Sequence, residues 1–229
     1  GDLYDVPPGG RRLSDIWGHR WLNSGKAHPE NWKRILHGYL AATSFADWNV
    51  GRVIDALDES RHADNTILVF WSDNGFHLGE KNHYEKATLW EWSARIPAAV
   101  RIPGNPNNGK VARQPIVSID FFTTLMDYCS LNQPEHEPQG ISLRPLLENV
   151  ETKWKRPAIT TYGEKLFSAR SERYRYIRYP DGEEELYDHD KDPNEFINLA
   201  NKPDYKYVID QFKKWIPENF APDLGGRNG

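Results

Sequence analysis

One apolar run, residues 66–71 (TILVFW), constrains the fold of this chain more than any other stretch. Its side chains are β-branched, aliphatic or aromatic, without polar alternation. Such a strand is typical of a parallel sheet that is covered on both faces. A second apolar run, residues 98–102, precedes Pro103-Gly104 and predicts a neighbouring strand in the same mainly parallel sheet.

Two helices are expected to flank these strands. Before the first strand, apolar residues recur at helical spacing over residues 30–57, and Pro29 suits the first turn. After the second strand, Ser118 or Asp120 could cap a helix. That helix is expected to carry four side chains inward, namely Phe122, Leu125, Met126 and Cys129. Helix, strand, strand and helix in this order predict an α/β layer.

The pattern changes after residue 134. From residue 157 the chain shows short strands, of which the last two are joined by the turn residues Pro180-Asp181-Gly182, and then a helix over 204–215. We expect residues 1–134 to belong to the α/β domain and residues 135–229 to form a subdomain with a small antiparallel sheet and a terminal helix. Residues 1–26, rich in Gly, Pro and Arg, are expected to be an extended surface segment.

Charge, hydropathy and cysteine count argue against several classes of function. The net charge of −4 over 229 residues predicts neither nucleic-acid binding nor membrane binding, which need a basic face. No apolar run reaches the length of about 20 residues that spans a bilayer, and no signal peptide is recognised at the start. Cys129 is the only cysteine, so an internal disulfide and a Cys-rich zinc site are excluded.

The first strand ends in Ser72-Asp73-Asn74-Gly75, where ligands bind in open α/β sheets. Asp73 offers an anionic oxygen and Asn74 a neutral carbonyl oxygen, and both suit Ca²⁺ or Mg²⁺. Gly75 is expected to let the backbone turn sharply. The alternative is a tight hairpin turn at Asn74-Gly75. Against it, roughly twenty residues without strand alternation follow, and loops of that length are usually functional or disordered.

Three further side chains of this stretch could contact a ligand. Lys86 can hold a phosphate or sulfate oxygen, although a lone lysine is more often a solvated surface residue. His77 and His83 could donate protons or touch a substrate, and each could equally be an ordinary loop histidine.

Residues 66–104 resemble the second-half signature of the sulfatases, within the alkaline phosphatase superfamily. In that family a strand ends in Ser-Asp-His-Gly or Ser-Asp-Asn-Gly, followed by Leu-Gly-Glu, a loop lysine, an Arg-x-Pro strand and Pro-Gly. The corresponding positions here are 72–75, 78–80, Lys86, 95–97 and 103–104. Residues 192–200 (DPNEFINLA) are similar to the family's carboxy-terminal motif. The resemblance covers most of residues 30–200 and is closest to iduronate-2-sulfatase-like and other sugar-sulfate enzymes.

The resemblance implies a fold and a set of roles. The fold would be the second half of an alkaline-phosphatase-like parallel sheet with helices, followed by the small antiparallel subdomain. Asp73 and Asn74 would be ligands of a Ca²⁺ ion, with Mg²⁺ as a further candidate, and Lys86 would contact the sulfate. His77 would touch the sugar. Lys81 and His83 depart from the family spacing before the lysine, so the resemblance assigns them no role.

The family's nucleophile is expected elsewhere. Sulfatases oxidise the Cys or Ser of a Cys/Ser-x-Pro-x-Arg motif to formylglycine, and neither Cys129 nor Ser171 has that context. The implied partner is therefore the amino-terminal half of the same sulfatase, and the implied substrate is a sulfated carbohydrate or an aryl sulfate. The lone chain is expected to be inactive and to expose a sheet edge and an apolar face. The family resemblance implies a periplasmic or extracellular location, or a lysosomal one in a eukaryote.

Two other functions stay open at this point. A phosphatase or phosphonate hydrolase of the same superfamily would share the Asp-Asn site and differ in its nucleophile. A noncatalytic carbohydrate-binding or interaction module would have no need to keep Asp73, Asn74 and Lys86 together.

Overall fold

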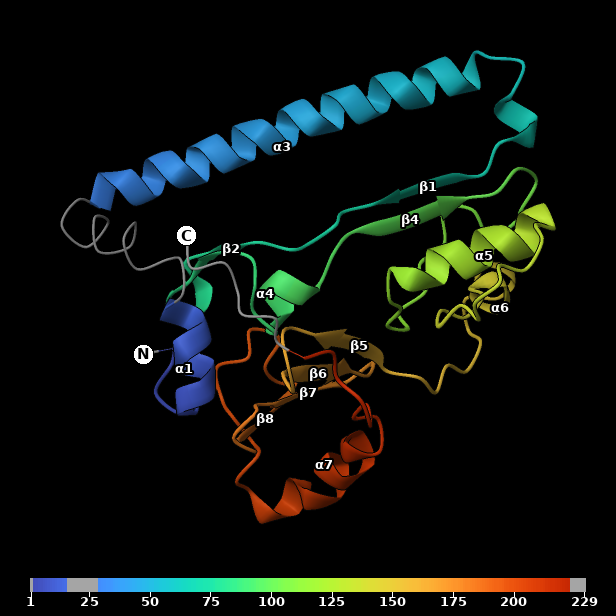
Figure 1. Cartoon of the computed structure of the whole chain (residues 1–229). Helices are drawn as coiled ribbons and strands as arrows, with labels where there is room; N and C mark the ends of the chain where they lie inside the picture. The colour runs from blue at the N-terminus through green and yellow to red at the C-terminus, as the bar shows by residue number, and fades with distance from the viewer. Residues whose placement is uncertain (1, 16–28, 223–229) are drawn as a thin grey trace.

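The computed structural model describes residues 2–15 and 29–222 (Figure 1). A long helix lies along one side, an antiparallel sheet with its own helix lies on the other, and shorter elements lie between them (Figure 1). Among the helices of these two ranges, none combines the length and the apolar character needed to cross a membrane.

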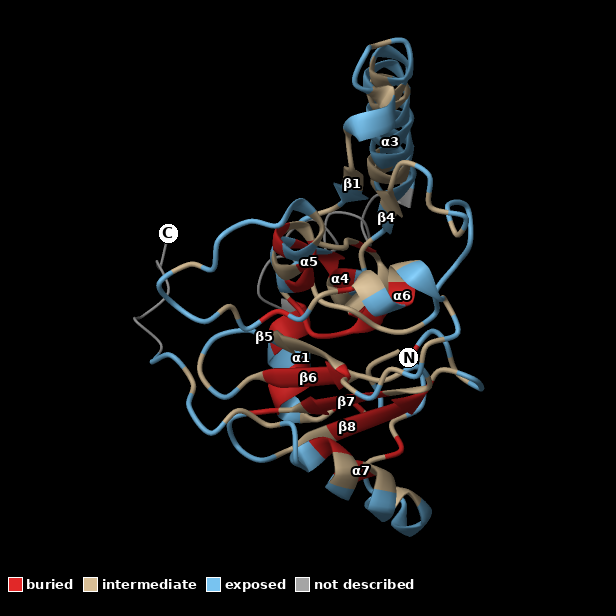
Figure 2. Cartoon of the chain, turned by 90° about the vertical axis from the view of Figure 1, so that its right-hand side faces the viewer, coloured by how far each residue is buried: buried red, intermediate tan, exposed pale blue. Residues whose placement is uncertain are grey.

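Helix α3 (Pro29–Asp58) confirms the predicted helix and its Pro29 start, and it runs for 30 residues. Gly38 lies inside the helix without interrupting it. The indole of Trp32 donates to the carbonyl oxygen of Leu78 at 2.9 Å and ties down the amino-terminal end of the helix. Several large apolar side chains of α3 are exposed, namely Trp32, Tyr39, Leu40, Phe45, Trp48 and Val53. Figure 2 shows the helix standing away from the buried parts of the chain.

Strands β1 (Leu68–Trp71) and β4 (Ala98–Arg101) are neighbours, as predicted, but they pair antiparallel, with Leu68 opposite Arg101. The expected parallel pairing of these two strands was wrong. Residues 72–97 leave the carboxy-terminal end of β1 and enter β4 at the same edge of the sheet. A parallel pair would need a crossover connection to the opposite edge. Phe70 and Trp71 are 40% and 47% exposed, so the described residues do not supply the expected cover on both faces.

Two short helices pack beside this pair of strands. Helix α5 (Ile119–Cys129) is followed by α6 (Arg144–Glu148). The expected inward face of α5 was partly wrong, because Phe122 and Cys129 are exposed while Phe121 and Met126 are buried. The carboxylate of Asp120 accepts from the backbone N–H groups of Val117 and Ile141 and thereby fixes the start of the helix.

The predicted antiparallel sheet is confirmed. Its four strands are β5 (Ala158–Thr161), β6 (Phe167–Arg170), β7 (Tyr174–Arg178) and β8 (Glu184–Asp188), in that order. Gly182, at φ 88°, occupies the left-handed position of the turn between β7 and β8. After the single turn η3 (Pro203–Tyr205), helix α7 (Lys206–Lys213) buries Ile209 and Phe212 against the sheet.

Residues 8–15 form a further helix, α1 (Pro8–Asp15), which corrects the expected extended segment. Residues 16–26 of that segment lie outside the described residues. Pro8 suits a first helical position, because its missing N–H would be unpaired there in any case. A Cβ atom on Gly9 would lie 2.7 Å from the ring of Tyr179, so the glycine lets α1 approach the β7–β8 hairpin. The glycines that suggested a loop therefore allow close packing of a helix.

Candidate functional site

The predicted site residues lie on one excursion of the chain, residues 72–97 between β1 and β4, which we call the site loop. It contains β2 (His77–Leu78), the single turn η2 (Glu80–Asn82), β3 (Tyr84–Glu85) and α4 (Glu91–Ala94). The structure therefore contradicts the alternative of a two-residue hairpin at Asn74-Gly75, since β1 pairs with the distant β4.

Gly75 fixes the position of Asp73 and Asn74 relative to α4. Its N–H donates to the carbonyl oxygen of Ser93 at 2.9 Å. A Cβ atom at this position would lie 2.2 Å from the carbonyl oxygen of Trp92, where only glycine fits. The backbone of Gly75 is not left-handed. Gly75 is thus required for a close approach between two backbone segments, and not for the sharp turn that the sequence suggested.

Asp73 and Asn74 follow β1 directly. Asp73 is exposed and Asn74 is half-buried, and neither side chain forms a hydrogen bond or ion pair with a described residue. The hydroxyl of Ser72 donates to the backbone oxygen of Asn74 at 2.8 Å and braces the turn. A free carboxylate beside a free amide oxygen suits a hard cation such as Ca²⁺, which takes about 6–8 oxygen ligands. The pair fits the ion but supplies only part of its coordination, and metal binding here stays a prediction.

Lys86 stands on a strained turn. Its neighbours Glu85 and Ala87 have φ values of 79° and 73°, which residues with a side chain adopt only at a cost. The backbone oxygen of Lys86 lies 2.9 Å from Nε2 of His83. Its side chain is exposed, and no described carboxylate pairs with its ammonium group. Lys86 therefore presents an uncompensated positive charge, as an anion-holding residue must.

His77 is fully buried below this turn. Its Nδ1 lies 3.1 Å from the backbone oxygen of Glu80, and its Nε2 lies 2.8 Å from the hydroxyl oxygen of Thr88. Burial, together with the positive charge of His83, lowers the pKa of His77 to about 3. The ring is therefore neutral, with Nδ1–H donating to Glu80 and Nε2 accepting from Thr88. It supports the loop from within, and its contact with a sugar stays a prediction.

Lys81, for which the family resemblance implies no role, is buried as well. Its ammonium group donates to the backbone oxygen of Glu195 and lies 3.2 Å from Oδ1 of Asp2. It also lies 5.1 Å from the centre of the Tyr187 ring. These contacts satisfy the charge inside the protein, so Lys81 anchors the site loop and offers no free charge to a ligand.

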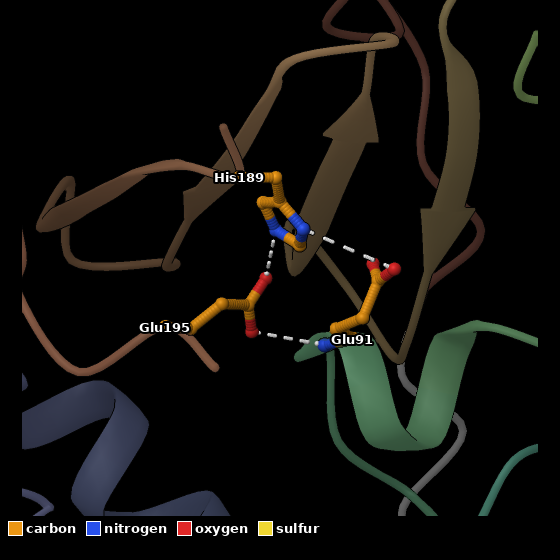
Figure 3. A group of neighbouring side chains, drawn as sticks. All are labelled: Glu91, His189 and Glu195. Carbon is orange, nitrogen blue, oxygen red and sulfur yellow. Dashed lines mark hydrogen bonds and ion pairs between the residues drawn. The ribbon is translucent and has the colours of Figure 1, made fainter. Parts of the chain in front are cut away.

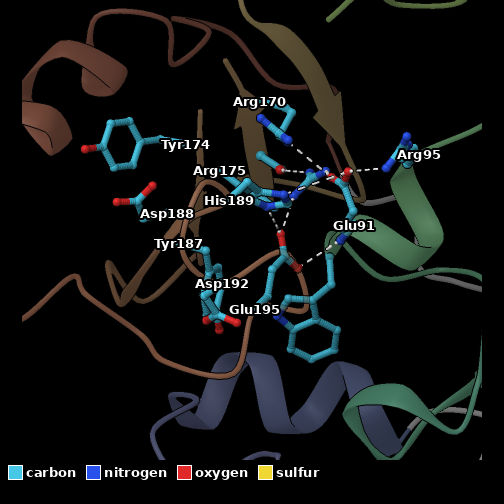
Figure 4. A network of polar contacts seen from close by, with 12 residues as sticks. Glu91, Arg95, Arg170, Tyr174, Arg175, Tyr187, Asp188, His189, Asp192 and Glu195 are labelled. Atoms are coloured by element: carbon cyan, nitrogen blue, oxygen red, sulfur yellow. Dashed lines mark hydrogen bonds and ion pairs between the residues drawn. The ribbon is translucent and has the colours of Figure 1, made fainter. Parts of the chain in front are cut away.

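A buried ion network holds the end of the site loop. Figure 3 shows Glu91, His189 and Glu195, whose ligand atoms lie within 4.8 Å of one another. Nε2 of His189 lies 2.9 Å from Oε1 of Glu195. Arg175 reaches both carboxylates, with its Nε 2.8 Å from Oε1 of Glu195, and Nε of Arg170 lies 3.2 Å from Oε2 of Glu91 (Figure 4).

The two guanidinium groups decide the character of this network. Burial alone would raise the pKa of Glu91, but the charges of Arg175 and Arg170 outweigh it and lower that pKa to about 2. The spacing of the three side chains would suit a metal ion, but the arginines already neutralise both carboxylates. The group therefore acts as an ion network that joins the site loop to the antiparallel sheet. The sequence placed Glu195 in a recognised motif but gave no sign of its partners.

Comparison with known proteins places these features in a family. Residues 79–220 match the model of the carboxy-terminal part of N-sulphoglucosamine sulphohydrolase, and residues 15–131 match the sulfatase model. The chain is 38% identical to a sulfatase of Formosa agariphila, over 96% of this chain and 43% of that protein.

Two solved structures are similar in sequence and fold. One is a protein in complex with its substrate D-glucosamine-2-N,6-O-disulfate, at 26% identity and a TM-score of 0.71, over 87% of this chain and 44% of that one. The other is a phosphonate monoester hydrolase of Agrobacterium radiobacter, at 27% identity and a TM-score of 0.66, over 74% and 38%. The chain thus spans less than half the length of these relatives.

Proposed function

Because this chain belongs to the sulfatase family, we propose that the protein containing it hydrolyses a sulfuric ester of a sugar. The observation that carries the proposal is the site loop. It begins with Asp73 and Asn74, whose side chains have no partner among the described residues, and it later presents Lys86 as an exposed, uncompensated cation. Free oxygen ligands and a free cation on one braced loop suit the binding of a metal ion and a sulfate group.

The roles follow from the chemistry of the three side chains. Asp73 and Asn74 would hold a hard cation, with Ca²⁺ favoured over Mg²⁺ because one carboxylate and one amide oxygen belong to a large, flexible oxygen shell. The bound cation would supply charge stabilisation at the sulfate oxygens. Lys86 would hold another sulfate oxygen and stabilise the negative charge that grows as the S–O bond breaks.

The nucleophile would come from the part of the sulfatase fold that this chain does not contain. No Cys/Ser-x-Pro-x-Arg motif occurs in the sequence, so a formylglycine would lie in the remaining part. The exposed apolar residues of α3 and β1, among them Phe45 and Trp71, offer a surface for that part. The lone chain would then be inactive, because covalent catalysis needs the nucleophile.

The substrate class rests on the named relatives. A neighbour bound to a disulfated glucosamine favours a sulfated sugar. Similarity to a phosphonate monoester hydrolase keeps a second function open, since sulfate and phosphonate esters need similar anion sites. The complete enzyme should therefore be assayed in parallel on an aryl sulfate, a sulfated glucosamine and a phosphonate monoester.

The test of the site uses the same complete enzyme. Asp73→Ala should abolish Ca²⁺ binding, measured by calorimetry, together with turnover of the aryl sulfate. Lys86→Ala should keep Ca²⁺ binding and lower turnover and the affinity for inorganic sulfate. Arg144→Ala, which removes a solvent-accessible ion pair between α6 and Asp127 of α5, serves as the control. Near-normal kinetics for both site variants would refute the assigned roles, and activity confined to the phosphonate would support the second function.

A further inference from the structure

His83 joins helix α1 to the turn that carries Lys86. The ring is fully buried. Its Nδ1 lies 3.0 Å from the backbone oxygen of Ser14, near the carboxy-terminal end of α1, and its Nε2 lies 2.9 Å from the backbone oxygen of Lys86. One imidazole thus bridges the backbones of Ser14 and Lys86, which are far apart along the chain.

The two partners of this ring determine its protonation. A backbone carbonyl oxygen accepts hydrogen bonds and cannot donate one, whereas a neutral imidazole carries a single N–H. Both contacts of His83 are therefore hydrogen bonds only if both ring nitrogens are protonated. His77 differs, because its Nε2 faces a hydroxyl group that can donate. The centres of the two rings lie 5.2 Å apart, and the rings meet edge to face.

The end of α1 stabilises a positive charge at this place. The last carbonyl groups of a helix are unpaired within it and carry partial negative charge. The amino-terminal end of α1, which carries partial positive charge, faces a carboxylate: the N–H of Gly9 donates to Oε2 of Glu183 at 3.1 Å. Gly9 and Gly10 also seat α1 closely on Tyr179 and Glu185. The helix is therefore a firm support for the ring of His83.

The turn at Lys86 needs such a support. Left-handed backbone at Glu85 and at Ala87 stores strain that surrounding contacts must hold in place. We propose that His83, as a doubly protonated ring, is the positioning residue of Lys86: it hydrogen-bonds the Lys86 carbonyl and ties it to α1. This inference rests on the proposed function for the role of Lys86, and it assigns to His83 no contact with substrate.

A double-mutant cycle on the complete enzyme tests the proposal. His83→Gln keeps a donor for only one of the two carbonyl groups. It should lower kcat/KM on an aryl sulfate by about 10- to 100-fold, because small displacements of a catalytic group have effects of that size. In a Lys86→Met background the same change should have no further effect, since contacts that act as a unit are not additive. If the kcat/KM losses of His83→Gln and Lys86→Met multiplied in the double variant, the proposal would be overturned.

A matched control separates positioning from loss of stability. Phe212→Leu on α7 weakens a buried cluster that does not include the site loop. At a temperature well below its melting point it should leave kcat/KM unchanged in both backgrounds. Amide exchange over residues 84–88 should rise in His83→Gln and stay unchanged in Phe212→Leu. Equal exchange in the two variants would count against the proposal.

A spectroscopic measurement is independent of activity. In the complete enzyme labelled with [15N]histidine, both ring nitrogens of His83 should show shifts of protonated imidazole nitrogens at neutral pH, with the signals assigned through His83→Gln. A neutral ring would overturn the proposal even in an active sulfatase. Conversely, a protein with the doubly protonated ring that hydrolyses no sulfate ester would refute the proposed function and leave the bridge between α1 and the Lys86 turn intact.

Discussion

The backbone N–H of Glu91 donates to Oε2 of Glu195 over 2.9 Å, although the two residues lie 104 positions apart. Both are buried, and Arg175 pairs with both of their carboxylates. This contact fastens the end of the site loop to the segment after β8. The stability of the site loop therefore depends on a charge network that joins Glu91 to residues outside the loop.

Arg175→Met should unfold the protein at a much lower urea concentration. Removing one partner of a buried ion network leaves the other charges uncompensated and costs about 3–5 kcal/mol of unfolding free energy. Arg175→Lys should recover only part of this loss, because an ammonium group cannot reach two carboxylates with a planar fork. Arg144→Met is the control: it removes a solvent-accessible ion pair with Asp127, and such pairs contribute little to stability. Equal losses at both positions would contradict the role given to the network.

Gly75→Ala should destabilise the protein and misplace Asp73 and Asn74. The added Cβ atom would meet backbone oxygens of Trp92 and Arg95 at 2.2 and 2.7 Å, and backbone cannot yield as a flexible side chain can. We expect a loss of about 2 kcal/mol or more, measured by urea unfolding.

Gly38→Ala provides the opposite control for this change. Gly38 lies inside α3 with nothing within 4 Å of an added Cβ atom. Alanine is the better helix former, so the unfolding free energy should rise by about 0.5–1 kcal/mol. If Gly75→Ala also stabilised the protein, the close approach between Gly75 and the backbone of α4 would be wrong.

Local sequence patterns predicted the elements with strong periodicity. Helix α3, the adjacency of β1 and β4, and the sheet from β5 to β8 follow from apolar spacing and turn residues. The direction of the β1–β4 pair could not be predicted from these patterns. A continuously apolar strand indicates that both of its faces are covered in the complete fold, but it does not indicate whether its neighbour runs parallel or antiparallel. Helix α1 was missed because Gly and Pro signal loops, while here Gly9 and Gly10 serve close packing.

The candidate site was predictable only in part. The free side chains of Asp73, Asn74 and Lys86 belong to a contiguous motif that a sequence displays directly. The supports of that motif are distant in sequence: Ser14 for His83, and Arg175 and Glu195 for Glu91. No local spacing connects such residues, so their roles emerge only from the folded chain.

As the pH falls, protonation of His77 should lower the free energy of unfolding before protonation of the carboxylates does. The pKa of His77 is about 3 in the folded chain and 6.5 in its ordinary state. Because the folded pKa is lower, the unfolded chain binds the extra proton first, and stability falls as pH drops below about 6.5. His77→Gln should remove the part of this slope between pH 6.5 and 4.5, measured by urea unfolding. His136→Gln, which replaces an exposed histidine, is the control. A slope that persists in His77→Gln would show that the ring is not held neutral.

The exposed apolar face of α3 should behave in opposite ways in the lone chain and in the complete enzyme. Phe45 and Val53 are 67% and 68% exposed and lie eight positions apart, hence on one side of the helix. In the lone chain this surface favours self-association. Phe45→Lys and Val53→Lys should therefore lower the sedimentation-detected oligomer fraction without lowering the melting temperature. Asp47→Lys, about 200° around the helix from Phe45, is the control and should change neither quantity.

In the complete enzyme the same two lysines should instead be destabilising, because a charge would be buried against the remaining part of the fold without a partner. The expected loss is about 2 kcal/mol or more for each lysine variant, measured by urea unfolding beside Asp47→Lys. Monomeric behaviour of the lone chain at high concentration would contradict the first expectation. Unchanged stability of the complete enzyme carrying Phe45→Lys and Val53→Lys would show that the remaining part of the sulfatase fold covers some other surface.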